Sequence, residues 1–219
     1  MHRYGGIWTG DNRSWWSHLL LNIKMMPSLN MCGFLYSGAD VGGFSDNTTE
    51  DLLTRWIQFG IFMPLLRNHT AAWTRQQEPY AFEHTERLKK WIKLRYALIP
   101  HLYSEYMKAA LEGGMYFKPL AFEYEDEYVR EVEDQLLVGE SLMIAPVYEQ
   151  NKTGRYVYLP EDMLLVTFED EKTYTLTKMA KGHHYVACDM DHLILFVRPG
   201  RMLLLGAAAD STKDLDMTS

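Results

Sequence analysis

Apolar residues recur in the first half of the chain with two different periods. Helical spacing, at every third or fourth position, occurs in three segments, residues 15–26, 49–59 and 88–111. Two short, bounded apolar runs, residues 31–36 and 62–66, predict buried strands between these helices. Pro100 should kink or split the last helix, and Gly113-Gly114 suits a left-handed C-cap at its end. Strand and helix therefore alternate over residues 1–115.

Polar and glycine-rich segments separate these elements. Residues 5–12 and 37–44 are punctuated by glycine and are expected to form a loop and a turn. Thr48 to Asp51 resembles a capping box in which Asp51 replaces the usual Glu, so a helix should begin near Thr49. A polar loop should follow His69 and continue to about Glu83.

The pattern changes after Gly114. Short strand candidates follow one another, separated by turn residues, at residues 142–147, 155–159, 164–168, 173–176, 184–188 and 193–197. Closely spaced short strands are typical of a sandwich. We therefore expect an α/β unit over residues 1–115, an antiparallel β-sandwich over 116–209 and a frayed polar tail over 210–219.

Composition narrows the classes of function. The 219 residues are 47% hydrophobic and 23% charged, which is typical of a globular protein and excludes a disordered chain or coiled coil. A net charge of −7 without a basic stripe disfavours nucleic acid, and the apolar runs are too short to span a membrane. Cys32 and Cys188 are expected to be buried free thiols, and the first residues lack a signal peptide, so we expect a cytoplasmic protein.

One polar residue follows each strand region of the first half. Asp11, Asp40 and His69 are each 29 positions apart, which is near the length of a βα unit. In a (β/α)₈ barrel such positions share the rim where active sites lie. Trp8 lies close in sequence to Asp11, and Phe44 lies close to Asp40. Aromatic rings beside carboxylates are suited to binding a sugar. The spacing matches no metal site. For Asp11, a helix N-cap is the structural alternative to an acid role.

Three segments carry a resemblance to a known family. They are RYGGIWTGDN at residues 3–12, GADVGGF at 38–44 and RNH at 67–69. In this order and spacing they closely resemble glycoside hydrolase family 31, in particular its bacterial α-glucosidases. The resemblance continues through YVYLP at 156–160 and FVRPG at 196–200. It implies about the last three βα units of a TIM (β/α)₈ barrel, followed by the proximal C-terminal β-sandwich.

The resemblance also implies roles for individual residues. The family is retaining and acts on α-linked sugars with two aspartates and no cofactor. Asp11 matches the general acid/base, and His69 matches a histidine that binds a hydroxyl of the sugar in the −1 position. The remaining matches are a pocket-wall tryptophan, an aspartate at the end of the seventh barrel strand, a nearby pocket residue and a loop-orienting arginine, namely Trp8, Asp40, Phe44 and Arg67.

One departure from the family pattern affects the expected activity. The family's nucleophile lies in a Trp-x-Asp-Met-Asn-Glu motif upstream of the acid/base, and this chain contains no such motif. CDMD at residues 188–191 lacks the flanking residues and falls in the β-region. We therefore expect a fragment of a retaining α-glucosidase acting on α-linked oligosaccharides, with the missing N-terminal part as its partner. The alternatives are an inactive sugar-binding remnant, or an α-xylosidase or α-galactosidase of the same family.

Overall fold

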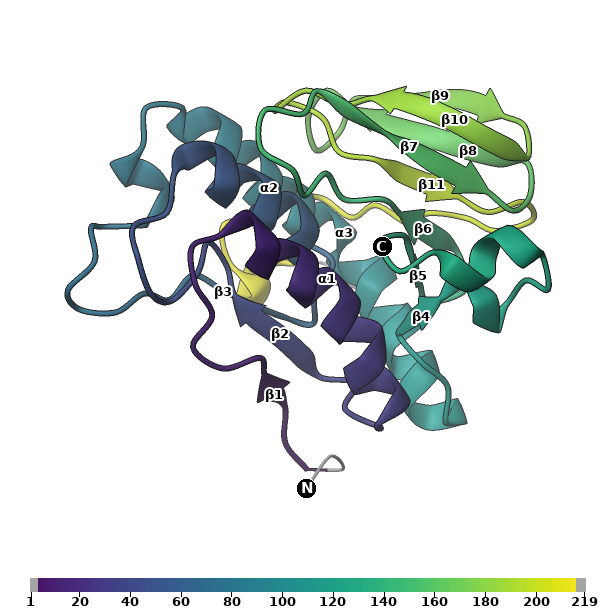
Figure 1. Cartoon of the computed structure of the whole chain (residues 1–219), viewed down its shortest axis with the longest axis horizontal. Helices are drawn as coiled ribbons and strands as arrows, with labels where there is room; N and C mark the ends of the chain where they lie inside the picture. Colours follow the sequence, from purple (N-terminus) through teal and green to yellow (C-terminus); the bar gives the residue numbers. More distant parts are fainter. Residues whose placement is uncertain (1–3, 216–219) are drawn as a thin grey trace.

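Three parallel strands and three long helices form the N-terminal half of the chain (Figure 1). The computed structural model describes residues 4–215. β2 lies between β1 and β3 and pairs with both in parallel. The elements are β1 (Ile7–Trp8), α1 (Trp16–Met31), β2 (Ser37–Asp40), α2 (Glu50–Gly60), β3 (Leu65–Arg67) and α3 (Thr85–Glu112), with a short 3-10 helix η1 (Pro79–Ala81) before α3. This arrangement confirms the expected part of a barrel.

The second and third strands were predicted too early in the chain. β2 lies within the predicted turn 37–44 rather than in the apolar run 31–36, and all four of its residues are buried. A Cβ on Gly38 would lie 2.0 Å from the carbonyl oxygen of Leu65, so the space between neighbouring strands admits only a small residue there. β3 likewise starts at Leu65, three residues after the start of the predicted run 62–66. Cys32, expected in a buried strand, instead follows α1 and is exposed.

The helices agree more closely with the pattern. α2 begins one residue after Thr49, but the predicted capping box is wrong, because Thr49 is the N-cap and its side chain accepts no bond from a backbone N–H of the helix. Its hydroxyl donates to the Asp51 carboxylate, which accepts a bond from its neighbour's N–H instead. α3 runs through Pro100 and ends at Gly113, whose φ of 74° confirms the left-handed C-cap.

Two antiparallel sheets form the C-terminal half. The six-stranded sheet has the order β4-β5-β6-β11-β8-β9, and β7 pairs with β10 in a separate two-stranded sheet. All six predicted strands are present, whereas β4 and β5 were not predicted. The elements are β4 (Phe117–Pro119), η2 (Leu120–Phe122), η3 (Glu127–Glu131), β5 (Leu136–Val138), β6 (Leu142–Ile144), β7 (Gly154–Leu159), β8 (Met163–Phe168), β9 (Tyr174–Met179), β10 (Gly182–Ala187), β11 (Leu195–Val197) and η4 (Thr212–Asp214).

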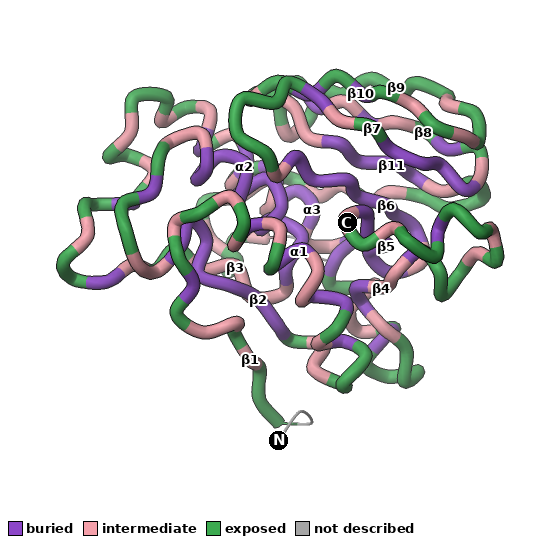
Figure 2. The backbone as a smooth tube through the Cα atoms, in the orientation of Figure 1, coloured by how far each residue is buried: buried purple, intermediate pink, exposed green. Residues whose placement is uncertain are grey.

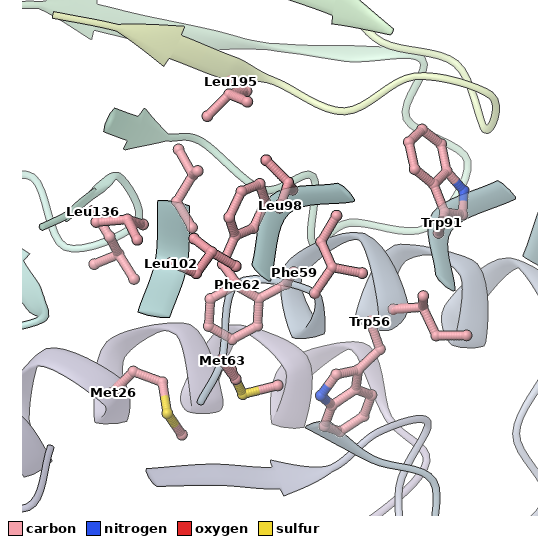
Figure 3. Close-up of a cluster of buried hydrophobic side chains, with 14 of the residues drawn as sticks. Met26, Trp56, Phe59, Phe62, Met63, Trp91, Leu98, Leu102, Leu136 and Leu195 are labelled. Carbon is pink, nitrogen blue, oxygen red and sulfur yellow. The ribbon is translucent and has the colours of Figure 1, made fainter. Parts of the chain in front are cut away.

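The central strands β5, β6 and β11 of the six-stranded sheet are buried on both faces. Side chains alternate along a strand, so Leu136 and Val138 face the helices while Leu137 faces β7 and β10. Figure 3 shows Trp56 and Trp91 from α2 and α3 in the core that the helices share with this sheet. The second core fills the space between the two sheets, which confirms the sandwich. Figure 2 shows the buried stretches of β5, β6 and β11 running through the middle of the molecule.

A buried arginine joins α2 to the sandwich. Arg55 is fully buried, and its guanidinium donates to the carbonyl oxygens of Asp189 at 2.8 Å, Cys188 at 2.7 Å and Lys152 at 3.1 Å. One turn further along α2, Gln58 donates to the carbonyl of Met190 at 3.0 Å. The CDMD segment resembled part of a nucleophile motif, but its backbone carbonyls instead accept hydrogen bonds from side chains of α2.

Two features lie at the limits of the described residues. The polar tail predicted over 210–219 contains η4, and its residues 216–219 lie outside the described part of the chain. The predicted boundary near residue 115 falls between the end of α3 and the start of β4 and stays a prediction. Among the helices of residues 4–215, none is both long and apolar enough to cross a membrane.

We expect Arg55→Met to lower the free energy of unfolding by about 3 kcal/mol, because three buried carbonyls lose a charged donor. Urea unfolding followed by circular dichroism measures this change. Arg201→Met is the matched control: Arg201 is half-exposed and pairs with Glu140 at the surface, so its removal should cost less than about 1 kcal/mol. Equal losses for the two variants would contradict the stabilising contact of Arg55 between α2 and the sandwich.

Candidate active site

The ends of the three parallel strands form one rim. Asp40 at the end of β2 lies in register with Arg67 at the end of β3, and Trp8 at the end of β1 lies beside Gly38. Carboxyl ends of parallel strands meet at the same edge of a sheet, as in the site-bearing face of a barrel. The loops that continue from these ends carry Asp11 and His69 to the same edge. The structure thus brings the three residues of the 29-residue spacing together.

A buried ion pair lies at the centre of this rim. The Asp40 side chain is 0% exposed, and its Oδ1 accepts bonds from Arg67 Nε at 2.8 Å and from Arg67 Nη2. The other oxygen, Oδ2, is buried without a hydrogen-bond partner within residues 4–215. Burial raises the pKa of Asp40, and the neighbouring Arg67 and His69 oppose that rise. Asp40 is therefore a sequestered carboxylate held by one arginine.

Arg67 connects all three strand ends. Besides bonding Asp40, its guanidinium carbon lies 5.6 Å from the centre of the Trp8 ring, within range of a cation–π contact. Its backbone carbonyl accepts a bond from Val41 N–H at 2.8 Å. Trp8 remains 47% exposed, so one part of its ring contacts Arg67 while the rest is accessible to solvent.

Asp11 differs from Asp40 in its surroundings. Its side chain is exposed in the loop after β1, and no hydrogen bond or ion pair ties it to another described residue. It is near enough to Asp40 for its charge to raise that residue's pKa. The alternative role as a helix cap is wrong, because the N-cap of α1 is Trp15 and no side chain caps this helix. Asp11 is thus free to face a ligand.

Asn12 is a positioning residue that the sequence did not single out. Its Nδ2 donates to the carbonyl of Asp40 at 3.1 Å, and its Oδ1 accepts from Phe44 N–H at 2.9 Å. The side chain is buried, so the amide fixes the loop after β1 to the loop after β2. The signal was present, since Asn12 closes the TGDN segment, but no role was assigned to it from the sequence.

The aromatic residues of the rim meet across the same two loops. The rings of Phe44 and His69 are 5.1 Å apart and tilted by 32°. Phe44 is held through its carbonyl, which accepts bonds from Ala71 N–H at 2.9 Å and from the Thr70 hydroxyl at 3.1 Å. His69 is exposed, so its ring packs on Phe44 while its nitrogens remain accessible.

A buried glutamine holds the base of the loop after β3. Gln77 Nε2 donates to the carbonyls of Val41 at 2.9 Å and Gly43 at 3.1 Å, and Asn68 Nδ2 donates to the Gln77 carbonyl at 2.9 Å. Gly43 has a φ of 97°, and a Cβ there would lie 2.3 Å from Ser14 N. The sequence reasoning missed Gln77, which lies in a polar loop without periodic neighbours.

The side chains that converge here suit binding and proton transfer to a polar ligand. An exposed carboxylate, an exposed imidazole and an accessible indole ring surround a sequestered ion pair. Rings can cover the apolar C–H faces of a sugar, while the carboxylate and imidazole can bind hydroxyl groups. Within residues 4–215, no group of three His, Cys, Asp or Glu side chains could hold a metal ion.

Comparison with known families covers almost the whole chain. The protein-family model described as the glycosyl hydrolases family 31 TIM-barrel domain matches residues 1–105. The model described as the glycosyl hydrolase family 31 C-terminal domain matches residues 113–203. The two matches follow the division between the parallel and the antiparallel sheets.

Similar individual proteins share the same family. Alpha-glucosidase 2 of Bacillus thermoamyloliquefaciens is 39% identical over 218 residues, which cover 97% of this chain and 27% of that protein. The chain thus spans about a quarter of the length of this relative. The crystal structure of the glucosidase II alpha subunit bound to Glc1Man2 matches 90% of the chain and 21% of its own, with a TM-score of 0.82 and 32% identity. The GH31 alpha-xylosidase of Xanthomonas citri matches 96% of the chain and 24% of its own, with a TM-score of 0.78 and 25% identity.

We expect Arg67→Met to destabilise the protein in a pH-dependent way. Without Arg67 the pKa of Asp40 rises further, and at pH 7 the folded state holds a buried carboxylate without its counter-charge, which should cost about 3 kcal/mol. The folded-state pKa lies above the unfolded one, so lowering the pH protonates the folded state first and the loss shrinks toward about pH 4. Urea unfolding at several pH values measures the effect.

The double variant Asp40→Asn/Arg67→Met is the control. It removes the anion together with its partner, so its loss should be smaller at pH 7 and nearly independent of pH. A loss for Arg67→Met that stays constant between about pH 4 and pH 7 would show that Asp40 is not the group left uncompensated.

Proposed function

Because the chain belongs to glycosyl hydrolase family 31, we propose that it supplies the acid/base side of a retaining α-glucosidase site. The contrast between the two carboxylates of the rim carries this proposal. Asp40 is buried and bonded to Arg67, so it is poorly placed to exchange protons with a ligand. Asp11 is exposed and unbonded within the described residues, so it can approach a glycosidic oxygen. Retaining hydrolysis needs such a group as acid and then as base.

The neighbouring side chains fit the binding of a terminal glucose. The exposed part of the Trp8 ring can cover one face of a pyranose, and His69 can donate to a hydroxyl of the same sugar. Phe44 supports the His69 ring. Arg67 acts as a positioning residue, because it holds Asp40 and packs on Trp8.

The nucleophile has to come from outside these 219 residues. The chain contains no Trp-x-Asp-Met-Asn-Glu motif, and the CDMD segment is bound by Arg55 at the sandwich. We propose that a polypeptide carrying the remaining barrel strands is the partner, and that its aspartate attacks the anomeric carbon while Asp11 protonates the leaving oxygen. Asp11 then takes a proton from the water that releases the sugar.

Two other functions have specific support. The absence of the nucleophile motif favours a sugar-binding remnant without turnover. The match to an alpha-xylosidase favours α-xyloside as a different substrate within the family. An α-galactosidase would be a change of substrate of the same kind. We prefer α-glucoside because the identity to an alpha-glucosidase is 39%, against 25% for the alpha-xylosidase.

We further propose a cytoplasmic location. Cys32 is exposed and Cys188 buried, and both are free thiols. An exposed free thiol persists best in a reducing compartment. Oxidation-sensitive labelling of Cys32 in cells would test this location directly.

We expect the purified chain to release no p-nitrophenol from p-nitrophenyl α-glucoside above the rate of its Asp11→Asn variant. General acid/base catalysis alone contributes about 10²–10⁴ in rate and cannot replace a missing nucleophile. Release that Asp11→Asn abolishes would contradict the proposal, since a carboxylate of this chain would then have to act as nucleophile.

The complementary experiment places the chain in a complete barrel. The matching 218-residue segment of the Bacillus relative is exchanged for this chain, and the chimera is assayed with aryl α-glucosides and α-xylosides. We expect α-glucoside hydrolysis that Asp11→Asn lowers by about 10²–10⁴ in kcat. The loss should be smaller for 2,4-dinitrophenyl α-glucoside, whose leaving group needs little protonation. An equal loss for both leaving groups would argue against the acid role of Asp11. Faster hydrolysis of the α-xyloside than of the α-glucoside would favour an α-xylosidase.

A further inference from the structure

A row of aromatic rings lies on the outer face of the two-stranded sheet β7–β10. Tyr156 pairs with Tyr185 across the strands, and Tyr158 pairs with His183, with ring centres 5.3 Å and 4.8 Å apart. Tyr128 from η3 extends the row, 5.3 Å from the Tyr158 ring and 5.2 Å from His183. Residues two apart on a strand share one face, so the five rings form a continuous strip, here called the aromatic row.

Four rings of the aromatic row face solvent, whereas Tyr158 is only 6% exposed and belongs to the core between the two sheets. Tyr156 is 74% exposed, and Tyr185 and Tyr128 are each 54% exposed. The alternate positions, Val157 and Val186, point inward and belong to the core between the two sheets. Burial in the fold therefore does not explain the exposed rings. Exposed aromatic groups that gather in one place typically mark a binding surface.

A cleft of about 360 Å³ lies at the Tyr156–Tyr185 end of the aromatic row. One of its walls is rigid and polar, since Asp134 accepts a bond from the Tyr148 hydroxyl at 2.7 Å and pairs with Arg155 at 2.7 Å. Glu149 and Lys152 also line the cleft and are more than half exposed, 3.5 Å apart. Ring faces and accessible hydrogen-bonding groups therefore adjoin each other.

We propose that the aromatic row and this cleft bind a segment of an α-linked glucan outside the candidate active site. Pyranose rings present apolar C–H faces that stack on tyrosine rings, and their hydroxyls suit the polar groups of the cleft and the phenol edges. The choice of α-linked glucan, and only that choice, rests on the proposed function. The substrate of that function and the ligand of the aromatic row would be the same polymer.

The dimensions of the surface favour a single polymer chain over a protein partner. Two six-residue strands make a strip about 20 Å long and about 10 Å wide. A standard protein interface needs about 800 Å² on each partner, several times this area. A strip of this length, with rings paired across the two strands, matches a few consecutive sugars.

This surface is separate from the rim described above. In Figure 1 the loops that follow β2 and β3 project to the left, whereas β7 and β10 lie at the upper right. The two are connected through α2, because Arg55 holds the carbonyl of Lys152 in the lining of the cleft. A glucan bound at the aromatic row would thus be held on the same rigid body as the candidate active site.

Native electrophoresis of the purified chain in gels containing amylopectin tests the proposal. We expect amylopectin to retard the chain, and Tyr156→Ala/Tyr185→Ala to weaken the apparent affinity about tenfold, through the loss of two ring contacts. Tyr103→Ala is the matched control, since Tyr103 is equally exposed on α3. Trp8→Ala removes a ring of the candidate active site and should weaken retardation less than the double tyrosine variant does. Tyr156→Phe/Tyr185→Phe keeps the rings and should retain most of the affinity.

Several outcomes would overturn the proposal. Absence of retardation, equal weakening by Tyr103→Ala, or loss of retardation in Trp8→Ala would each do so. The single variant Tyr156→Ala, which changes a mostly exposed side chain, replaces the double variant if the latter misfolds. Retardation by hydroxyethyl cellulose and not by amylopectin would overturn the α-linkage taken from the proposed function while keeping a sugar site. A dimer that the double variant dissociates in sedimentation would assign the face to a second copy.

Discussion

The apolar core between the helices and the six-stranded sheet is the interaction on which the remaining structure depends. Trp56 and Trp91 are fully buried although only three parallel strands lie within the described residues, because the helices share one core with sandwich side chains such as Leu136 and Leu195. Arg55 adds a polar anchor at the edge of the same contact. The sandwich therefore supports the helices from outside, and the helices hold the strand ends in place.

Support from outside allows the rim to contain an energetically costly pair. A carboxylate with one unbonded oxygen, as in Asp40, is unfavourable in a buried position unless a cation stays in contact with it. Arg67 can remain in contact because Trp8 limits where its guanidinium moves. The result is a fixed dipole beside the exposed Asp11. Fixed charges around a reacting group need no rearrangement during a reaction, which is how preorganised sites lower barriers.

Much of this architecture could be predicted from periodicity. The three helices and six of the sandwich strands were located because their apolar positions repeat over enough residues. β2 was misplaced for a physical reason: Gly38 lies too close to Leu65 of the neighbouring strand to carry a side chain, and glycine in a sequence suggests a turn. β4 and β5 were missed because they are short and, unlike β6 and β11, do not lie in longer apolar runs.

The candidate site shows the same division. Asp11, Asp40 and His69 could be found because strand ends recur at equal spacing, and the family resemblance assigned their roles. Asn12 and Gln77 could not, because their importance lies in bonds to backbone groups about 30 to 35 positions away along the chain. No local pattern encodes such a contact.

The amide of Asn12 has a consequence for how this rim can change over evolutionary time. It donates through one atom and accepts through the other, with the two backbone partners at fixed distances on a neighbouring loop. Aspartate has no donor to offer, glutamine is longer by one methylene, and serine has a single polar atom. Variation beside Asp11 is therefore restricted by shape rather than by chemistry. New substrate preferences would have to arise from the outer loops, leaving this joint untouched.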